Sequence, residues 1–316
     1  MLTLVEASKL IQNPLQKGVV EIFARTSPVL QYLPFMTIAG NAYSWNMENT
    51  LPGIAFRGYN ASYSEDTGVV QQSTEALKIF GGLVKLDRAQ VKTQGNVNNI
   101  RAIHTGLAAK AAALHFTETF FKGDSSADAN AFDGLENRLT GNQVLSMGSQ
   151  AGGVALTLAK LDELIDSVYG GPDVLFMNKT MRRRVNALMR SEDQATEQVS
   201  GVFGQQLPAY AGIPIGIIEE GRDGTAILPY DEPDADGNSA SCTSIYAVKF
   251  GAQEYVSGLQ ASGGLEVEDQ GAVETFLVTL IEWICSIAIF HPKAAARLKN
   301  VIVADVSDQT TTTTTA

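Results

Sequence analysis

The sequence predicts an α+β fold in which one long helix and a long β excursion stand beside a separate α/β part. Three observations predict it. Residues 41–92 contain short β-like runs separated by Gly, Pro, Asn and Asp clusters. Residues 96–121 carry the strongest helical period of the chain. After residue 130, strand-like and helix-like segments alternate.

Composition limits the function classes. The 316 residues are 45% hydrophobic and only 18% charged, and the net charge of −11 argues against a nucleic-acid binder, which needs an excess of Lys and Arg. Cys242 and Cys285 form no paired motif, so both are predicted to stay reduced. The most apolar window, residues 276–290, is too short to span a membrane and predicts a buried strand. The first ten residues lack a signal-peptide pattern, so synthesis in a cytoplasm is expected.

The first two segments are predicted to project. Residues 1–40 are broken by Pro14, Pro28 and Pro34, which predicts an extended arm and not part of a core. Residues 41–92 predict a long two-stranded hairpin. Its middle has isolated aromatics among Gly and Pro and little apolar repeat, which is typical of a loop that docks on something else.

The helical period of residues 96–121 predicts one apolar stripe on a strut-like helix. Its members lie at steps of three, four and seven: Ile100, Ile103, Leu107, Leu114 and Phe121. Gly123 stands where a C-terminal cap belongs, and a polar linker runs to residue 130.

Residues 131–272 predict the α/β part. Helices are expected at 158–168 and 179–189, the second N-capped by Asn178, and strands at 174–177, 213–219, 226–229 and 244–249. Residues 231–238 predict an exposed acidic turn. A long strand is expected within residues 273–290, and residues 308–316 are expected to be disordered.

A search for chemistry yields no catalytic, cofactor or metal residue, so the chain is predicted not to be an enzyme. Nucleotide-binding loops and hydrolase motifs are absent from the sequence. The acidic turn begins like a calcium loop at Glu232, but Thr243 stands where that loop needs a bidentate Glu. The three histidines, His104, His115 and His291, have no accompanying set of ligands and are expected in a core or an interface.

One basic cluster stands out. Arg182, Arg183 and Arg184 are consecutive on a predicted helix and therefore fan around it. Salt bridges between subunits or a solvated face suit them better than phosphate binding.

The order of several short segments resembles a known family. Residues 51–57 (LPGIAFR) look like the tip of an extended E-loop, and residues 77–87, with Gly81 and Gly82, like its return strand. Residues 96–121 match a spine helix, and residues 132–135 (FDGL) and 210–215 look like parts of an axial domain. Residues 291–294 (HPKA) look like the point where the chain finally returns to the peripheral domain. Together they resemble the major capsid proteins of tailed bacteriophages, which have the Hong Kong 97-like fold.

The resemblance implies an N-terminal arm at 1–40, an E-loop at 41–92, a peripheral P-domain with spine helix and linker at 93–130, an axial A-domain at 131–272 and a return strand to the P-domain at 273–307. It also implies hexamers and pentamers that form the icosahedral head of a virion, assembled in the host cytoplasm around double-stranded DNA without sequence-specific binding. A separate scaffolding protein, a portal and a decoration protein are the further partners expected.

The contact residues between subunits are expected in the E-loop, at its base and on the basic helix: Leu51, Pro52, Phe56, Arg57, Tyr59, Tyr63, Lys85, Asp87, Arg88, Arg182 and Arg183. Some members of the family crosslink an E-loop lysine to a neighbour. Residues 44–76 contain no lysine, which predicts a non-covalent shell.

Three alternatives stay open at this stage. An encapsulin, a bacterial protein compartment, shares the fold but holds cargo enzymes. An α/β enzyme could use the carboxylates between Asp231 and Asp236 with a metal. A phage tail or decoration protein is a third possibility, although the strut helix has no role there.

Overall fold

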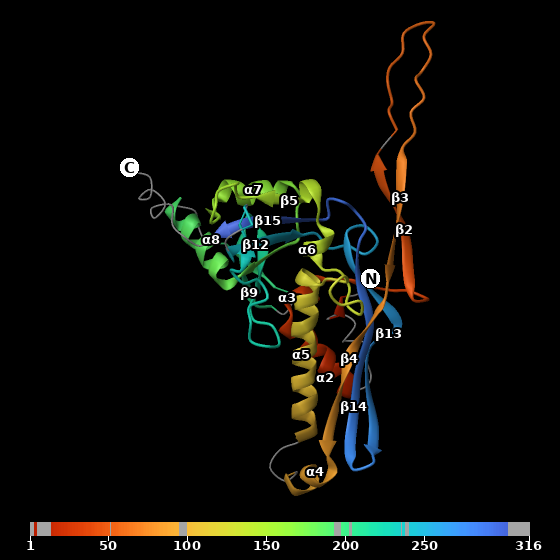
Figure 1. Ribbon diagram of the computed structural model, residues 1–316, viewed down its shortest axis with the longest axis vertical. Helices are drawn as coiled ribbons and strands as arrows, with labels where there is room; N and C mark the ends of the chain where they lie inside the picture. The colour runs from red at the N-terminus through yellow and green to blue at the C-terminus, as the bar shows by residue number, and fades with distance from the viewer. Residues whose placement is uncertain are drawn as a thin grey trace.

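The computed structural model describes residues 3–4, 14–50, 52–94, 100–192, 197–201, 204–234, 236–237 and 240–302. Its shape has three parts, which Figure 1 shows: an α/β body, a long blade below it and a thin two-stranded hairpin that projects beyond both. Within the described residues, no helix is both long enough and apolar enough to cross a membrane.

The helices lie in the blade and on the body. In chain order they are α2 (Pro14–Thr26), α3 (Pro28–Tyr32), α4 (Arg88–Gln94), α5 (Ile100–Lys122), α6 (Leu135–Arg138), α7 (Leu158–Asp166) and α8 (Lys179–Ser191), with a 3-10 turn η1 (Gly141–Gln143).

The blade consists of α5 and a four-stranded sheet in the order β1-β13-β14-β4. Its strands are β1 (Phe35–Thr37), β13 (Val256–Val273), β14 (Phe276–Ile289) and β4 (Lys78–Asp87). The predicted strand within residues 273–290 is β14, which is confirmed. The partner β13, 18 residues long, had not been predicted, because its Gly-rich and acidic residues conceal the alternation of its buried side chains.

The strut helix is confirmed as α5, but of its predicted apolar stripe only Phe121 is fully buried. Ile103 and Leu107 are about half exposed (49% and 58%), so they lie on the solvent side. The buried face consists of small residues and phenylalanines: Thr105, Ala109, Ala113, Phe116, Thr117, Phe120 and Phe121. Small side chains such as alanine let α2 and the sheet pack close to the helix axis. The face that allows this close packing is therefore the buried one.

Gly123 ends the strut helix for a reason other than a left-handed cap. Its amide donates to Thr119 O at 2.8 Å, and Gly134 N donates back to Gly123 O at 2.8 Å. A Cβ here would collide with Thr119 O, 2.6 Å away, and with Phe132 O. The glycine therefore lets the chain after the helix pack directly against its last turn.

The N-terminal segment is not the extended arm that its prolines predicted. Pro14 and Pro28 are each the first residue of a helix, where proline is tolerated, and Ser27 accepts a hydrogen bond from Leu30 N as the N-cap of α3. Phe23 and Leu30 are fully buried against the strut helix and the blade sheet. Residues 1–2 and 5–13 lie outside the described part.

Aromatic rings fill the centre of the blade. Trp283 of β14 is fully buried and contacts Phe23 edge-on at 5.5 Å between ring centroids, Phe35 at 4.8 Å and Phe116 at 5.2 Å. The same apolar cluster continues through Phe121 to Phe176 and Tyr246 of the body. Blade and body therefore share one core.

The body is a nine-stranded sheet in the order β5-β15-β12-β7-β10-β9-β8, with β6 and β11 paired at its margins. The strands are β5 (Val144–Ser146), β6 (Val154–Ala155), β7 (Val174–Asn178), β8 (Glu197–Ser200), β9 (Gln206–Tyr210), β10 (Ile213–Ile218), β11 (Glu232–Pro233), β12 (Ala240–Val248) and β15 (Ala295–Ile302). Strand β7 is buried along its whole length because it lies between β10 and β12.

Most predictions for the body are confirmed. Helices α7 and α8 and strands β7, β10 and β12 lie where they were expected, and Asn178 Oδ1 accepts a hydrogen bond from Met181 N at 2.8 Å as the N-cap of α8. The strand predicted at 226–229 is wrong: only an isolated bridge joins Ala226 to Glu220. Residues 273–302 do not form one return segment either, since β14 belongs to the blade and β15 to the body. Residues 303–316, and with them the predicted tail, are outside the described residues.

Candidate inter-subunit surface

The most exposed feature of the protein is the hairpin of β2 (Ala42–Thr50) and β3 (Val69–Ala76). The strands pair antiparallel from Ala42 opposite Ala76 to Thr50 opposite Val69. The return strand is therefore β3, and the prediction that residues 77–87 fill this role is wrong. That segment is β4, which pairs with β14 along its full length, because Phe80 lies opposite Trp283 and extends the blade core.

Residues 52–68 form the tip of the hairpin and contain no helix or strand. Local contacts shape this segment. Gly53 N donates to Asp66 Oδ2 at 2.7 Å across the tip, and Arg57 donates to Ala61 O at 2.9 Å. The Arg57 guanidinium also lies 5.2 Å from the centre of the Tyr63 ring. The tip thus has a defined shape of its own, with every residue in it exposed.

Large apolar side chains of the tip point into solvent. Ile54 is 95% exposed, and Phe56 and Tyr59 are as exposed as in an extended chain. Burying a side chain of this size is worth about 1.5–3 kcal/mol, so leaving several in water forgoes a large stabilisation. A group of such residues on one projecting segment indicates a surface that another molecule covers.

The root of the hairpin is fastened to the body by polar and aromatic contacts. Glu75 of β3 lies 2.7 Å from Arg138 of α6 and accepts a hydrogen bond from Ser286 at 2.8 Å. Both charged side chains are about 85% buried, so removing either partner would leave a buried charge uncompensated, which costs more than breaking an exposed pair. On the other strand, Trp45 packs against Phe290 with 5.0 Å between ring centroids. These contacts set the direction in which the hairpin projects.

A second exposed apolar surface lies on the face of the blade sheet that points away from α5. Phe80 packs toward α5, so its neighbour Ile79 and the residue Leu83 point to the other face, because strand side chains alternate. They are 72% and 55% exposed. The register places Ile79 beside Ile284 and Leu83 beside Leu280, both half-buried.

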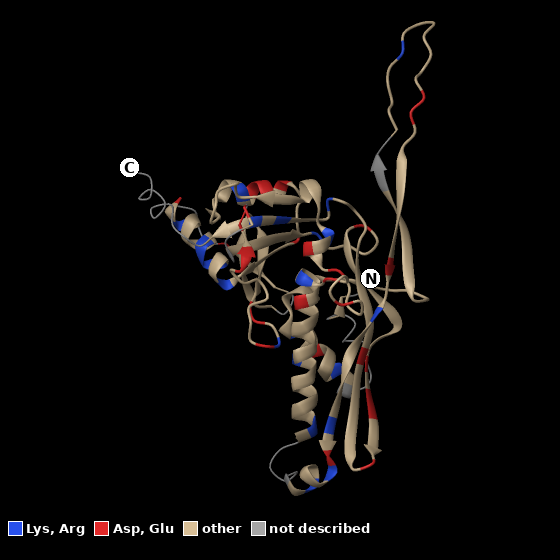
Figure 2. Ribbon diagram, in the orientation of Figure 1, with Lys and Arg blue, Asp and Glu red and all other residues tan. Residues whose placement is uncertain are grey.

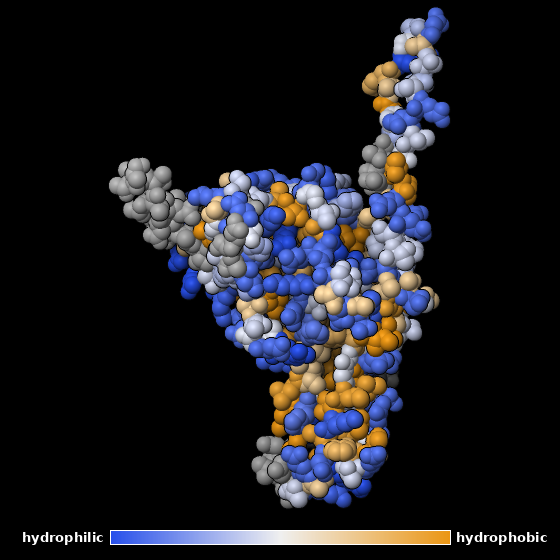
Figure 3. Space-filling view, viewed as in Figure 1, coloured by the Kyte–Doolittle hydropathy of each residue, from blue (hydrophilic) through white to orange (hydrophobic). Residues whose placement is uncertain are grey.

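Acidic residues border this apolar face. Glu266 of β13 lies directly opposite Glu282 of β14, and Glu282 is opposite Gly81. Like charges in opposed positions are unfavourable. Figure 2 shows acidic residues along these strands, and Figure 3 shows apolar surface over the blade.

The predicted contact residues occupy three separate regions. Pro52, Phe56, Arg57, Tyr59 and Tyr63 lie in the exposed tip, and Leu51 is outside the described residues. The other five lie elsewhere: Lys85 and Asp87 at the end of β4, Arg88 at the start of α4, and Arg182 and Arg183 on α8. The tip and the end of the blade stand at opposite ends of the molecule.

The charged candidates outside the tip have local structural environments. Asp87 Oδ1 accepts a hydrogen bond from Ala89 N at 2.7 Å, which helps begin α4. Arg182 is half-buried and Arg183 is exposed, so the three consecutive arginines do fan around α8. Sequence reasoning missed the residues that hold the hairpin root, Glu75 and Arg138, because they are 63 positions apart and no local pattern links them.

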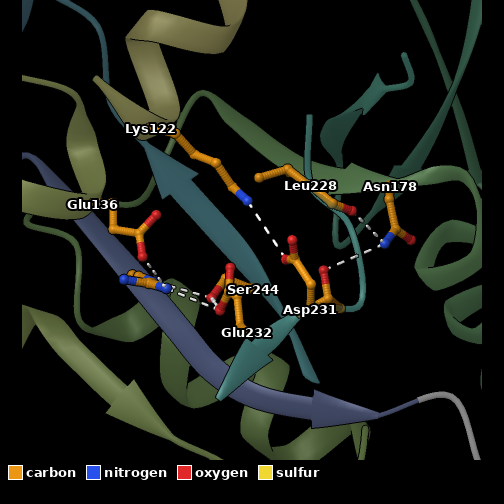
Figure 4. Close-up of polar contacts among 9 residues, drawn as sticks. Lys122, Glu136, Asn178, Leu228, Asp231, Glu232 and Ser244 are labelled. Carbon is orange, nitrogen blue, oxygen red and sulfur yellow. Dashed lines mark hydrogen bonds and ion pairs between the residues drawn. The ribbon is translucent and has the colours of Figure 1, made fainter. Parts of the chain in front are cut away.

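The acidic turn contains a buried ionic cluster, which corrects the prediction that it is exposed (Figure 4). Glu232 is 7% exposed. Its Oε2 accepts hydrogen bonds from Arg297 of β15 at 2.9 Å and from Ser244 at 2.5 Å, and Arg297 also donates to Glu136 at 3.0 Å. The cluster joins β11, β12, β15 and the start of α6.

Electrostatics agree with a structural role for this cluster. Burial alone would lower the pKa of Arg297, but Tyr246, Glu232 and Glu136 raise it above its ordinary value, so the guanidinium stays charged. Burial raises the pKa of Tyr246, whose ring lies beneath Arg297. The neighbouring Asp234 accepts a hydrogen bond from Gly152 N at 2.7 Å. In the part of the chain that the structure describes, no group of three or more His, Cys, Asp or Glu could hold a metal ion.

Solved structures with the same fold are capsids and related shells. A capsid of a native GTA particle is 15% identical, with a TM-score of 0.60 over 87% of this chain and 90% of that one. The Mycobacterium phage Bobi structure is 12% identical, with a TM-score of 0.57 over 86% and 89% of the two chains. At these identities the likeness shows the fold alone, and the predicted Hong Kong 97-like fold is confirmed.

Part of the sequence also matches a protein family. Residues 12–154 match the family described as Major capsid protein GP7. The predicted tailed-phage major capsid protein family is confirmed. This match covers α2, α3, the hairpin, β4 and the strut helix. No curated protein matches the chain.

The capsid protein also resembles an encapsulin. The holo-SrpI encapsulin complex from Synechococcus elongatus PCC 7942 is 17% identical, with a TM-score of 0.65 over 86% of both chains. Phage heads and protein compartments are thus built on one fold, and the fold does not distinguish what the shell contains.

Proposed function

We propose that this capsid protein assembles with copies of itself, as hexamers and pentamers, into a closed icosahedral head that encloses double-stranded phage DNA. The observation that carries the proposal is the projecting hairpin. Its tip exposes apolar residues that its own chain leaves uncovered, on a fold whose solved relatives include phage capsids. A subunit of this kind completes its apolar contacts only against another copy.

The proposed contact is between the hairpin tip of one copy and the outer face of a neighbour's blade sheet. The tip offers Ile54, Phe56 and Tyr59, and the sheet offers Ile79 and Leu83. Arg57 is the one cation among residues 52–68, which also carry Glu65 and Asp66, and the Arg57 guanidinium is the group that complements the opposed Glu266 and Glu282 beside the apolar face. Apolar burial supplies affinity, and the charge pairing supplies register.

The other predicted contacts extend the proposal. Lys85, Asp87 and Arg88 stand at the end of the blade, and Arg182 and Arg183 on α8. At these places charged groups would pair across further boundaries between copies. A portal, a decoration protein and a separate scaffolding protein are proposed as additional partners of the head.

The contents of the shell distinguish the proposal from its alternative, an encapsulin-type compartment, which the likeness to the cyanobacterial encapsulin favours. Electron microscopy of particles purified from the natural source, combined with nuclease-protected nucleic acid analysis, tests both. Closed shells that protect double-stranded DNA support the phage head. Shells that protect no DNA and contain an enzyme support the compartment. A protein that stays monomeric under every condition contradicts both.

A further inference from the structure

The root of the hairpin borders a cavity of about 540 Å³ that the contacts described so far do not fill. One wall is the hairpin itself, with Trp45 and Met47. The opposite wall is formed by the segment between α6 and β5, which includes Thr140 and Gln143, and Lys293 follows the end of β14. Thr140 and Lys293 are exposed, so the cavity is reachable from solvent.

Three buried polar atoms in this lining lack a hydrogen-bond partner among the described residues: Nε1 of Trp45, Oε1 of Gln143 and Nη2 of Arg138, the last of which is ion-paired with Glu75 at 2.7 Å. The Gln143 side chain is 9% exposed. With the Gln143 amide turned over, its nitrogen would occupy the position of Oε1 and would be the buried atom without a hydrogen-bond partner. A buried unpaired group costs about 1–3 kcal/mol, so its presence indicates that another group pairs with it.

The chemistry of the lining describes what it can bind. Trp45 needs an acceptor and Gln143 offers an acceptor that needs a donor, and each residue of an extended peptide supplies both. Gln143 directly precedes β5, which within the described residues pairs with β15 alone, and a free strand edge also favours an extended segment. Met47 and Pro292 give the cavity apolar walls.

The charges in the lining favour an acidic segment. Arg138 is neutralised by Glu75, whereas Lys293 has no carboxylate within ion-pair distance among the described residues. The cavity therefore has one surplus positive charge. The chain carries 34 acidic against 23 basic residues, so a second copy is rich in suitable carboxylates.

From these observations we infer that the cavity at the hairpin root binds an extended acidic segment of a second copy of this chain. This inference rests on the proposed function, which places copies side by side. The bound segment would lie beneath β2 and β3 and would hold the hairpin in one direction. Shell assembly would then be coupled to the position of the hairpin.

Photo-crosslinking identifies the occupant. p-Benzoylphenylalanine replaces Thr140 at the rim, and particles are assembled from equal amounts of subunits with ¹⁴N and ¹⁵N. Mass spectrometry is expected to find crosslinked peptides of mixed isotope, which join two copies, at an acidic segment. Crosslinks of a single isotope only, or crosslinks to a different protein, overturn the inference.

Two substitutions test the unpaired atoms. Trp45→Phe removes Nε1 but keeps an aromatic ring against Phe290, and Gln143→Met removes the amide at similar volume. We expect the free subunit to unfold at the same or a higher denaturant concentration, because an unsatisfied group is gone. The critical concentration for assembly is expected to rise roughly fivefold, the equivalent of one net hydrogen bond.

The two measurements are combined. An unaltered critical concentration means that solvent alone satisfies these groups, and it overturns the inference whatever the crosslinks show. Shells that form normally while the inference fails leave the proposed function standing. If the unsubstituted chain forms no shell under any condition, the proposed function and this inference both fail.

Discussion

The carboxylate of Glu75 lies 2.7 Å from the guanidinium of Arg138, and this pair joins the projecting hairpin to the body of the protein. Glu75 belongs to β3, the last strand of the hairpin, and Arg138 to the end of α6. Ser286 of β14 donates to the same carboxylate at 2.8 Å. One side chain thus connects hairpin, body and blade.

Glu75→Gln is expected to lower the free energy of unfolding by about 1–3 kcal/mol, because Arg138 then loses its charged partner in a mostly buried position. Hydrogen exchange in β2 and β3 should also become faster. Urea unfolding and exchange mass spectrometry measure the two effects. As a matched control, Glu219→Gln disrupts the exposed pair with Lys179 and should cost at most about 1 kcal/mol. Equal costs at both positions would contradict the role given to Glu75.

Phe56→Asp is expected to block shell assembly while the subunit stays folded, because it places a charge where the proposed contact buries a ring. Deletion of residues 52–63 should do the same. Electron microscopy measures assembly, and circular dichroism checks the fold. Phe56→Tyr, which keeps the ring, is the control and should assemble. Normal shells from the deletion variant would refute the proposed role of the tip.

Leu83→Asp tests the other side of that contact. It replaces an exposed apolar residue on the outer face of the blade sheet, so the free subunit should lose less than about 0.5 kcal/mol of stability. Assembly should nevertheless fail, since the tip of the neighbour would meet a charge. A variant that is stable and assembles normally would exclude this face as the docking surface.

Arg297→Met is expected to destabilise the subunit by about 3–5 kcal/mol, because Glu232 would remain buried without its cation. Denaturant unfolding measures the loss. Lys122→Met removes a nearby but more exposed pair with Asp231, and should cost less than about 1 kcal/mol. A similar small loss for both variants would show that the buried cluster contributes little.

Acid should loosen the joint between α5 and β13. A hydrogen bond from Arg101 holds the pKa of Asp269 below its ordinary value, aided by the Gly271 amide. A carboxyl whose pKa is lower in the folded state contributes stability above its unfolded pKa, near 3.9, and this contribution is lost as the pH falls below it. The unfolding temperature of Asp269→Asn should therefore fall less between pH 5 and pH 3 than that of the unsubstituted protein. Parallel curves would contradict this assignment.

Several features of the protein follow from the sequence by itself. Helix α8 could be predicted because Asn178 precedes an apolar period of 3.6 residues, and β7 because five consecutive residues suit a buried strand. The exposed tip follows from the lack of apolar repeat between Pro52 and Thr67. These are local properties, and local sequence determines them.

The tertiary structure decided what depends on distant partners. Strands β3 and β4 have similar local preferences, and only pairing with β2 or with β14 assigns one to the hairpin and the other to the blade. Helix α5 buries Ala109 and Ala113 and not Ile103, because small side chains on the buried face let α2 and the sheet approach the helix closely. Glu232 is buried because Arg297, 65 residues away in the sequence, neutralises it. Contacts of this range have no local signature, since their free energy exists only once the chain has folded.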